Sequence, residues 1–403
     1  MNHIPDLAAL NFLAFNFLAF NFLAVKRLAS NAARRPQVLL AAVIVLMLTG
    51  CAAAPEPARA SDSVPDTLQQ LARRHHVCAV ALAVIRNRRL ASVEVATGCA
   101  HAPTPTPDSV FQAASLSKPV FAYAVLKLVA QGKMGLDTPV LHYLPQGYRH
   151  QFDPMHLTPA EVVTDARLQA VTVRMILNHT SGLPNWAGGA LSFDATPGTR
   201  WGYSGEAYVM LQRAVEAVTG EPLDRFMRAH VFAPLAMNDS GYISDEHLVK
   251  NLLPGTKANG APRSTPLFRQ PIAAFSLYTS AADYAKFMVA VLNDAELMRL
   301  VSASAVTVDP RLGLDWGQGW GIERVKDARY LWQWGNNMGY RAFAMASIDA
   351  GDGFVMLTNS ENGLALAQPV ALKILPGEHT LFQSSILGSD IVNMLCNTVG
   401  ICL

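Results

Sequence analysis

A serine and a lysine three residues apart form the clearest chemical pattern in this sequence. They are the ends of the segment Ser115-Leu116-Ser117-Lys118. If a helix begins here, Ser115 and Lys118 lie on one face, one turn apart. A lysine held in a dry cleft can lose its proton and act as a base, and a serine hydroxyl requires such a neighbour to become a nucleophile. The segment predicts acyl-transfer chemistry, although S-x-x-K alone is common by chance in a chain with 22 Ser and 9 Lys.

Two later segments carry residues that fit the same chemistry. Tyr203 lies in Trp201-Gly202-Tyr203-Ser204-Gly205, at the start of a predicted helix, and its phenol can exchange a proton with Ser115 and Lys118. The segment Gln333-Trp334-Gly335-Asn336 closes a late predicted strand. A glycine such as Gly335 lets the substrate backbone approach closely, so Gln333, Trp334 and Gly335 are predicted to bind substrate.

Together these segments resemble the serine β-lactamase and penicillin-binding-protein superfamily, nearest the class C β-lactamase and family VIII carboxylesterase branch. The likeness runs from about residue 79 to 363, and further matching segments are 179–184, 231–237, 279–283 and 357–360. The resemblance implies that Ser115 is acylated while Lys118 and Tyr203 share its proton. It also implies an oxyanion hole made by the backbone N–H groups of Ser115 and Asn336.

The sequence departs from this family at two positions. Gly205 stands where the second motif often has an asparagine that holds an acyl-side amide. Gln333, followed by Trp334 and Gly335, stands where a lysine often attracts the substrate carboxylate. Losing such a charge-assisted contact costs about 1.5–3 kcal/mol, so a small ester with a neutral acyl group is the expected substrate. Trp334 either forms an apolar wall for that group or packs within the sheet.

The sequence disfavours two other kinds of site and leaves two related functions open. A Ser-His-Asp hydrolase is disfavoured because G-x-S-x-G is missing, and His179 is expected to be hydrogen-bonded scaffold. His142, His150 and His156 lack metal-ligand spacing, so neither a metal nor another cofactor is predicted. The alternatives that stay open are a β-lactamase or D-Ala-D-Ala carboxypeptidase, and a slow penicillin-binding lipoprotein without efficient turnover.

The composition of the chain limits which kinds of fold and which partners are possible. The chain has 403 residues, of which 51% are hydrophobic and 15% charged, with a net charge of +2. These values exclude extensive disorder and give no basic footprint for nucleic acid. The expected partner is a small ester, amide or peptidoglycan-like substrate, and the oligomeric state is undetermined.

Hydrophobic periodicity predicts one sheet completed by both termini, with an inserted helical lobe. The family resemblance implies that this is an α/β (α+β) fold with an antiparallel sheet flanked by helices and that the inserted lobe is all-helical. The sheet lobe is expected at about 67–135 and 322–403, and the helical lobe at about 136–321. Strands are predicted at 79–85, 90–95, 330–334, 340–348 and 354–358, and helices at 115–130, 171–177, 205–218, 222–230, 280–293 and about 385–395.

The N-terminal region predicts export. Residues 1–50 contain a basic pair followed by an eleven-residue apolar run, which is typical of a signal sequence, and the repeats before it suggest an over-called start codon or a first membrane segment. The run ends at Leu48-Thr49-Gly50-Cys51, which resembles a lipobox. Cys51 is therefore expected to be lipidated, with 51–66 as a flexible tether; cleavage near 52–54 without a lipid is the alternative. The mature protein would face the periplasm or cell exterior.

Four further cysteines suit an oxidising compartment. Cys78 and Cys99 bracket the first predicted hairpin, which would bring them near each other, and Cys396 and Cys402 could close a small loop. Two disulfides are plausible on this basis, and free buried thiols are the alternative for both pairs.

Overall fold

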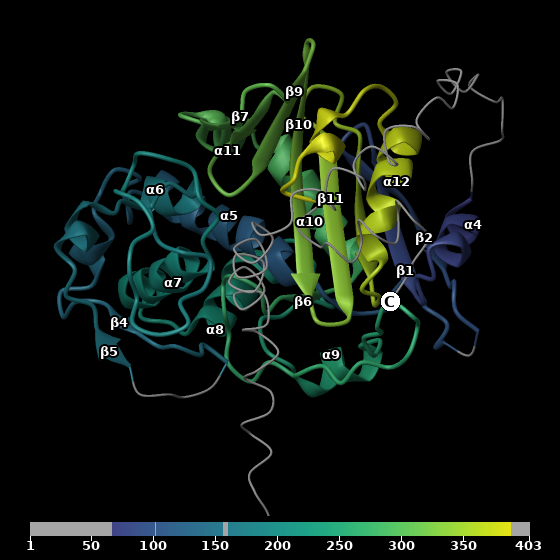
Figure 1. The fold of residues 1–403 in the computed structure, drawn as a ribbon, viewed down its shortest axis with the longest axis horizontal. Coiled ribbons are helices and arrows are strands. Elements are labelled where there is room, and N and C mark those ends of the chain that lie inside the picture. The colour runs from purple at the N-terminus through teal and green to yellow at the C-terminus, as the bar shows by residue number, and fades with distance from the viewer. Residues whose placement is uncertain (1–66, 101, 156–159, 388–403) are drawn as a thin grey trace, which may run out of the picture. The chain divides into compact units, whose positions relative to one another are not determined.

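The computed structural model describes residues 67–100, 102–155 and 160–387 (Figure 1). Residues 65–403 form one compact unit. The predictions for the signal sequence at 1–50, the tether at 51–66 with Cys51, and the pair Cys396 and Cys402 lie outside the described residues. Within the part of the chain that is described, no helix is long and apolar enough to cross a membrane.

An eight-stranded sheet forms the centre of the fold, in the order β2-β1-β12-β11-β10-β9-β8-β7. Neighbouring strands run antiparallel throughout. The first strand pairs with the last, with Val80 opposite Thr358, so the sheet is completed from both ends of the chain as predicted. The strands are β1 Val80–Arg86, β2 Arg89–Ala96, β7 Val306–Asp309, β8 Leu314–Trp316, β9 Gly321–Val325, β10 Ala328–Asn337, β11 Tyr340–Ser347 and β12 Gly353–Thr358.

Helices cover both faces of this sheet (Figure 1). The helices are α4 Leu68–Arg74, α5 Ser117–Ala130, α6 Val173–Leu177, α7 Gly205–Thr219, α8 Leu223–Met227, α9 Glu246–Asn251, α10 Ala281–Asn293, α11 Ala295–Ser302 and α12 Ala367–Ile374. Alternate side chains of β1 point to opposite faces, so Ala81 and Ala83 pack with α5 and α10, whereas Val80 and Leu82 pack with α4 and α12. Burial on both faces explains why β1, β11 and β12 are almost continuously apolar.

Polar caps fix where the site-bearing helices begin. The Ser204 hydroxyl accepts the N–H of Ala207 at the start of α7, and the Ser280 hydroxyl accepts the N–H of Asp283 at the start of α10. Gly220 ends α7 in the left-handed conformation, with φ of +71°. The predicted helices at 205–218 and 280–293 therefore match α7 and α10 closely.

Three predicted helices differ from the structure. Residues 114–116 form a 3₁₀ turn before α5, because Ala114 has a φ of +50°, which no α-helix accommodates. The helix predicted at 222–230 is α8 followed by one π turn at Arg228–Phe232. Residues 385–387 form a turn after the 3₁₀ segment Thr380–Gln383, and the remainder of the helix predicted to 395 lies outside the described residues.

Two short strand pairs lie outside the large sheet, and three of their four strands fall in the region predicted as the helical lobe. The pairs are β3 Phe111–Gln112 with β6 Tyr278–Thr279, and β4 Arg149–His150 with β5 Glu161–Val162. Although β7, β8 and α10 fall within 136–321, β7 and β8 extend the sheet and α10 packs on β1 and β2. The two-lobe boundaries stay a prediction.

A disulfide joins Cys78 and Cys99 at the open end of the β1–β2 hairpin. Their Cα atoms are 4.6 Å apart, within the range that a disulfide spans. The bond closes the hairpin on the side where α4 packs.

Candidate active site

Ser115 is the single accessible residue in a long buried segment. Every residue from 109 to 122 is buried except Ser115, which is partly open to solvent. Ala114, directly before it, is held at a φ of +50°, which costs a non-glycine residue free energy. The strained turn thus presents one hydroxyl at the surface while its neighbours stay in the core.

Hydrogen bonds from three distant elements hold this turn in place. Gln333 Nε2 of β10 donates to the Ser115 carbonyl at 3.1 Å, and the Tyr284 hydroxyl of α10 donates to the Leu116 carbonyl at 3.0 Å. The Tyr242 hydroxyl donates to the Ser117 carbonyl at 2.8 Å. Sequence reasoning missed both tyrosines, because nothing in their local sequence signals a contact more than a hundred residues away.

Ser117 is a structural clamp and presents no free hydroxyl. Its Oγ donates to the Ala114 carbonyl at 2.5 Å and accepts the N–H of Leu277 at 2.9 Å. The side chain is fully buried. Of the two serines in the S-x-x-K segment, only Ser115 is placed to react.

Lys118 points its ammonium group at Ser115 from inside the core. Its Nζ lies 3.3 Å from Ser115 Oγ and 2.9 Å from the Ala274 carbonyl, and the side chain is 1% exposed. The Tyr203 ring lies 4.7 Å from Nζ. Burial lowers the pKa of Lys118 to about 7. A large neutral fraction is therefore present at neutral pH, as a base requires.

Tyr203 also contacts the reactive turn. Its hydroxyl is hydrogen-bonded to the Ser115 side chain and accepts Gln333 Nε2 at 2.9 Å. Burial raises the pKa of Tyr203, and the hydrogen bonds to Ser115 and Gln333 offset only part of that rise. The phenol accordingly stays protonated and can pass a proton without carrying a lasting negative charge.

His179 holds Tyr203 in position through the backbone on either side of it. Its carbonyl accepts the Gly202 N–H at 2.8 Å, and its Nδ1 accepts the Ser204 N–H at 3.1 Å. The imidazole lies 4.3 Å from the Tyr203 ring. Burial, with the charge of Lys118, holds the pKa of His179 well below its usual range. The ring is a neutral scaffold, the role that sequence analysis expected for it.

Strand β10 passes close to the reactive turn because residue 335 is glycine. A Cβ at Gly335 would lie 2.5 Å from the Ala113 carbonyl oxygen. Two residues earlier, Gln333 is fully buried, and its amide N–H groups donate to the Ser115 carbonyl and the Tyr203 hydroxyl. Asn336 is exposed near the end of the same strand. Sequence analysis assigned Gln333 to substrate binding, and in the structure its amide braces two site residues.

Trp334 lies on the opposite face of β10 from Gln333. Its ring packs 4.9 Å from the Tyr203 ring and 5.7 Å from the Trp332 ring. Both packing and a role as an apolar wall were open from the sequence. The contacts observed are packing contacts, and they support the ring of Tyr203.

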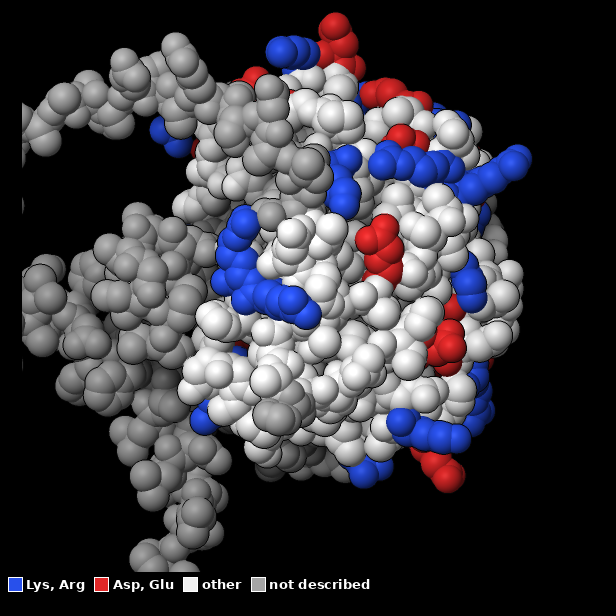
Figure 2. Space-filling view, turned by 90° about the vertical axis from the view of Figure 1, so that its right-hand side faces the viewer, with Lys and Arg blue, Asp and Glu red and all other residues white. Residues whose placement is uncertain are grey.

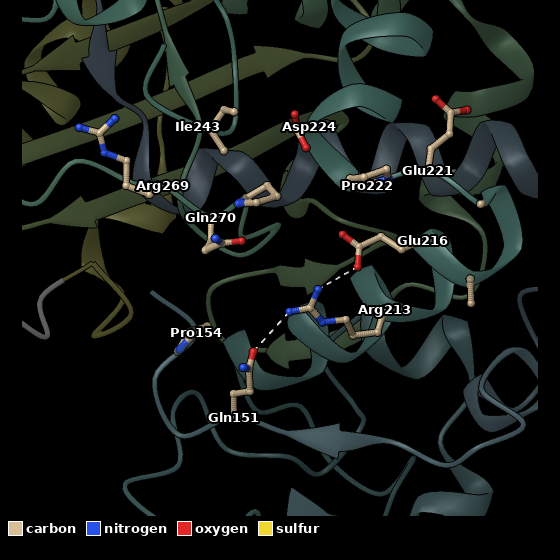
Figure 3. Close-up of a pocket in the computed structure, with 13 residues that line it drawn as sticks. Gln151, Pro154, Arg213, Glu216, Glu221, Pro222, Asp224, Ile243, Arg269 and Gln270 are labelled. Atoms are coloured by element: carbon tan, nitrogen blue, oxygen red, sulfur yellow. Dashed lines mark hydrogen bonds and ion pairs between the residues drawn. The ribbon is translucent and has the colours of Figure 1, made fainter. Parts of the chain in front are cut away.

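One surface cavity is separate from these residues. It has a volume of about 630 Å³ and lies where α7 ends and α8 begins (Figure 3). Arg213, Glu216 and Gln151 form a hydrogen-bonded row across it. It contains none of the predicted site residues. No group of three His, Cys, Asp or Glu side chains within the described ranges is placed to hold a metal ion.

Charge on the molecular surface gives no alternative site on the face drawn in Figure 2. There, Lys and Arg side chains lie scattered among Asp and Glu side chains, with wide uncharged areas between them. A field of one sign, such as nucleic acid requires, is not formed by the described residues of that face.

Comparison with known proteins agrees with the fold. The profile of the family described as Beta-lactamase matches residues 64–375. Esterase EstB of Burkholderia gladioli is 34% identical over 171 residues, which cover 34% of this chain and 40% of that esterase. Penicillin-binding protein 4 of Amycolatopsis lactamdurans is 29% identical over 293 residues, covering 62% of this chain and 73% of its own length.

Solved structures give the same fold at lower identity. An octameric penicillin-binding protein homologue from Pyrococcus abyssi superposes with a TM-score of 0.62 at 19% identity, covering 80% of this chain and 78% of its own. D-amino acid amidase from Ochrobactrum anthropi SV3 superposes with a TM-score of 0.60 at 21% identity, covering 75% and 94%. These likenesses concern the fold alone.

Proposed function

We propose, from the premise that this chain belongs to the beta-lactamase family and is a serine hydrolase, that it cleaves an ester or amide bond through an acyl-enzyme on Ser115. The observation that carries the proposal is the 3.3 Å contact between Ser115 Oγ and a buried Lys118 whose pKa is lowered to about 7. A small ester with a neutral acyl group is the preferred substrate.

Acylation begins with neutral Lys118. Its Nζ takes the proton of Ser115 as Oγ bonds to the substrate carbonyl carbon. The negative oxygen that forms is bound by the backbone N–H groups of Ser115 and Asn336, each worth about 2.7–4 kcal/mol in related chemistry. Tyr203 then gives its proton to the leaving oxygen or nitrogen and regains one from Lys118. The carbonyl–leaving-group bond breaks, which leaves an acylated serine and a neutral alcohol or amine.

Deacylation uses the same groups in reverse. A water molecule gives a proton to neutral Lys118 as its oxygen attacks the acyl carbon. The Ser115 oxygen leaves and takes that proton back, so both the serine and the lysine return to their starting states.

The neutral acyl preference rests on Gln333. This residue carries no charge, and its amide N–H₂ is already engaged by the Ser115 carbonyl and the Tyr203 hydroxyl. A substrate carboxylate placed beside it gains no ion pair, a loss of about 1.5–3 kcal/mol. The esterase among the relatives is consistent with this preference.

A second candidate is a penicillin-interacting protein: a β-lactamase, a D-Ala-D-Ala carboxypeptidase, or a lipoprotein that is acylated without efficient turnover. The alignment with penicillin-binding protein 4, which covers more of this chain than the alignment with the esterase, favours it. The chemistry up to the acyl-enzyme is shared, so the two candidates differ in which substrate acylates Ser115 and how fast water releases it.

We further propose that the protein acts outside the cytoplasm, with 1–50 removed, Cys51 lipidated and 51–66 as a tether. The Cys78–Cys99 disulfide supports an oxidising compartment. The site would lie between the lobe at about 67–135 and 322–403, which supplies Ser115, and the lobe at about 136–321, which supplies Tyr203. Cys51→Ser should move the protein from the membrane fraction to the soluble fraction, and an unchanged distribution would exclude the anchor.

Ser115→Ala tests the function directly. Purified wild type and variant are mixed with a chromogenic short-chain ester, a fluorescent penicillin and a fluorophosphonate probe. We expect ester turnover and probe labelling in wild type and a loss of nearly all activity in the variant, since the groups of such a unit act together. Ser92→Ala, at an exposed serine of β2, is the matched control, and peptide mapping of the labelled wild type reports whether the adduct is on Ser115.

The outcome also separates the two candidates. Rapid ester turnover with no lasting penicillin adduct supports the hydrolase of neutral esters. A persistent penicillin adduct without turnover supports the slow penicillin-binding protein. Equal ester hydrolysis by wild type and Ser115→Ala would refute the mechanism.

A further inference from the structure

We propose that Trp186, with Phe275, forms an apolar subsite that selects substrates carrying an aromatic or branched hydrocarbon group next to the scissile bond. The inference rests on the proposed serine hydrolase function and names the substrate chemistry that the site prefers. Trp186 is thereby a specificity-determining residue, which sequence analysis did not identify.

The first observation is the space above Gly205. A Cβ built on Gly205 would lie 2.6 Å from two carbon atoms of the Trp186 ring and 2.9 Å from the Asn185 carbonyl oxygen. No side chain fits at that position while the indole lies there. The glycine two residues after Tyr203 therefore makes room for an aromatic ring at the start of α7, beside the catalytic tyrosine.

The second observation is how firmly the backbone around Trp186 is held. The Asn185 carbonyl accepts the N–H groups of Gly205 and Glu206, each at 3.1 Å, and Asn185 Oδ1 also accepts the Gly205 N–H, at 3.0 Å. On the other side, the Ala187 N–H donates to Glu206 Oε1 at 2.9 Å. Both neighbours of Trp186 are thus fixed to the first turn of α7, and the ring is fixed between them.

The side chain of Glu206, which holds this loop, also forms a buried pair with His150. Glu206 Oε2 lies 3.1 Å from Nε2 of His150 of β4, and both side chains are at most 3% exposed. The mechanism proposed above uses neither residue. Burying two ionisable groups is costly, so a pair retained here indicates a positioning demand on the loop that Glu206 holds.

The third observation places the ring beside the reacting groups. Trp186 meets Phe275 edge to face at 5.4 Å. Phe275 directly follows Ala274, whose carbonyl accepts Lys118 Nζ, and its own carbonyl accepts Asn337 Nδ2 of β10. The pair of rings therefore bridges the segment that holds Lys118 and the helix that follows Tyr203.

The surface that these rings offer is apolar. Trp186 is 40% exposed although it lies on an anchored loop. On the same loop and the first turn of α7, Asn185 Oδ1 and Glu206 Oε1 already accept backbone N–H groups. An exposed aromatic surface gains free energy when it covers hydrocarbon.

The test compares substrates that differ only in hydrocarbon bulk. One arm varies the acyl group on a common p-nitrophenyl leaving group, acetate against phenylacetate. The other arm varies the alcohol on a common acetyl group, ethyl against benzyl. We expect wild type to prefer the bulkier member of one arm by about tenfold or more in kcat/KM, the scale on which an apolar pocket discriminates, and the arm affected identifies which side of the ester the rings cover.

Variants then assign the preference to the rings. In Trp186→Ala the ratio should fall toward one, mainly through a higher KM for the bulky ester. Trp186→Phe should restore a large part of the ratio. Glu206→Ala should reduce the ratio as Trp186→Ala does, whereas Glu206→Gln, which keeps an acceptor for the Ala187 N–H, should retain it. Leu372→Ala, at an exposed apolar residue of α12, is the control for surface truncation.

Two results would overturn the inference in distinguishable ways. If Ser115 is neither acylated nor needed for ester turnover, the proposed function fails and the subsite fails with it. If wild type hydrolyses esters through Ser115 but Trp186→Ala leaves both substrate ratios unchanged, the function stands and the assignment of Trp186 is wrong.

Discussion

The two ends of helix α5 carry lysines with opposite properties. Lys118 near the first turn is buried beside neutral groups, and burial lowers its pKa to about 7. Lys127 near the last turn is 40% exposed and bonds to Asp294. Burial also acts to lower the pKa of Lys127, but the hydrogen bond and charge of Asp294 outweigh it, so the net shift is upward. One helix thus carries an amine with a lowered pKa at one end and a permanent cation at the other.

The difference shows that the position of the counter-ion, more than the residue type, decides what a lysine does. Lys118 meets the Ser115 hydroxyl, the Ala274 carbonyl and aromatic rings, none of which carries a full negative charge. Without such a charge nearby, the proton is weakly held. Among the residues that the structure describes, Lys118 is buried without a carboxylate beside it, whereas Lys127 is paired with Asp294.

The largest expected effect is the difference in activity between a variant that lacks the Lys118 amine and one that lacks the Lys127 amine. Lys118→Met should lower kcat for ester hydrolysis by about 10²–10⁴-fold, the usual contribution of a general base. Lys127→Met should leave kcat within about twofold, because Lys127 touches none of the reacting groups. Steady-state kinetics on both variants, with circular dichroism to confirm folding, measures the contrast. Similar losses in both variants would show that the two ends do not differ in function.

The dependence of activity on pH sharpens the comparison further. Only neutral Lys118 can accept the serine proton, so kcat/KM should fall about tenfold per pH unit below pH 7 and level off above it. Placing a carboxylate next to the amine would shift this limb to higher pH. A profile that stays flat from pH 5 to 8 would contradict a lysine base with a lowered pKa.

The smallest expected effect is on stability. A lowered pKa means that, between about pH 7 and the ordinary lysine value near 10.5, the unfolded chain binds a proton that the folded protein does not. The free energy of unfolding of wild type should therefore rise with pH across this window relative to Lys118→Met, with a limiting slope of about 1.4 kcal/mol per unit. Urea unfolding at several pH values measures it. Lys127→Met keeps Lys118, so it should retain the wild-type slope, and the substitution should cost less than about 1 kcal/mol.

Local patterns in the sequence predicted much of this structure because they depend on neighbours. Alternation and apolar runs placed β1, β2 and β10 to β12, and helical periodicity placed α7 and α10 to within two residues. The spacing of Ser115 and Lys118 predicted a contact across one helical turn, which is a local property. The contact survives although Ser115 lies in a 3₁₀ turn rather than in the α-helix itself.

Contacts between distant segments could not be predicted in this way. The tyrosine hydroxyls that hold Leu116 and Ser117, the Ala274 carbonyl that binds Lys118 and the Trp186 ring above Gly205 depend on tertiary packing. Gln333 shows the limit most clearly. Its neutrality was visible in the sequence, but its bonds to Ser115 and Tyr203 follow only from the register of β10 beside the 3₁₀ turn.

The pairing of the first sheet strand with the last has a consequence for how activity arises during synthesis. Val80 cannot pair with Thr358 until the chain has been synthesised beyond residue 358. Strand β10, whose Gln333 donates a hydrogen bond to the Ser115 turn, is also synthesised late. A nascent chain halted before that point would carry the nucleophile but lack its support. We therefore expect the Ser115 turn to become competent only after β10 and β12 have been made.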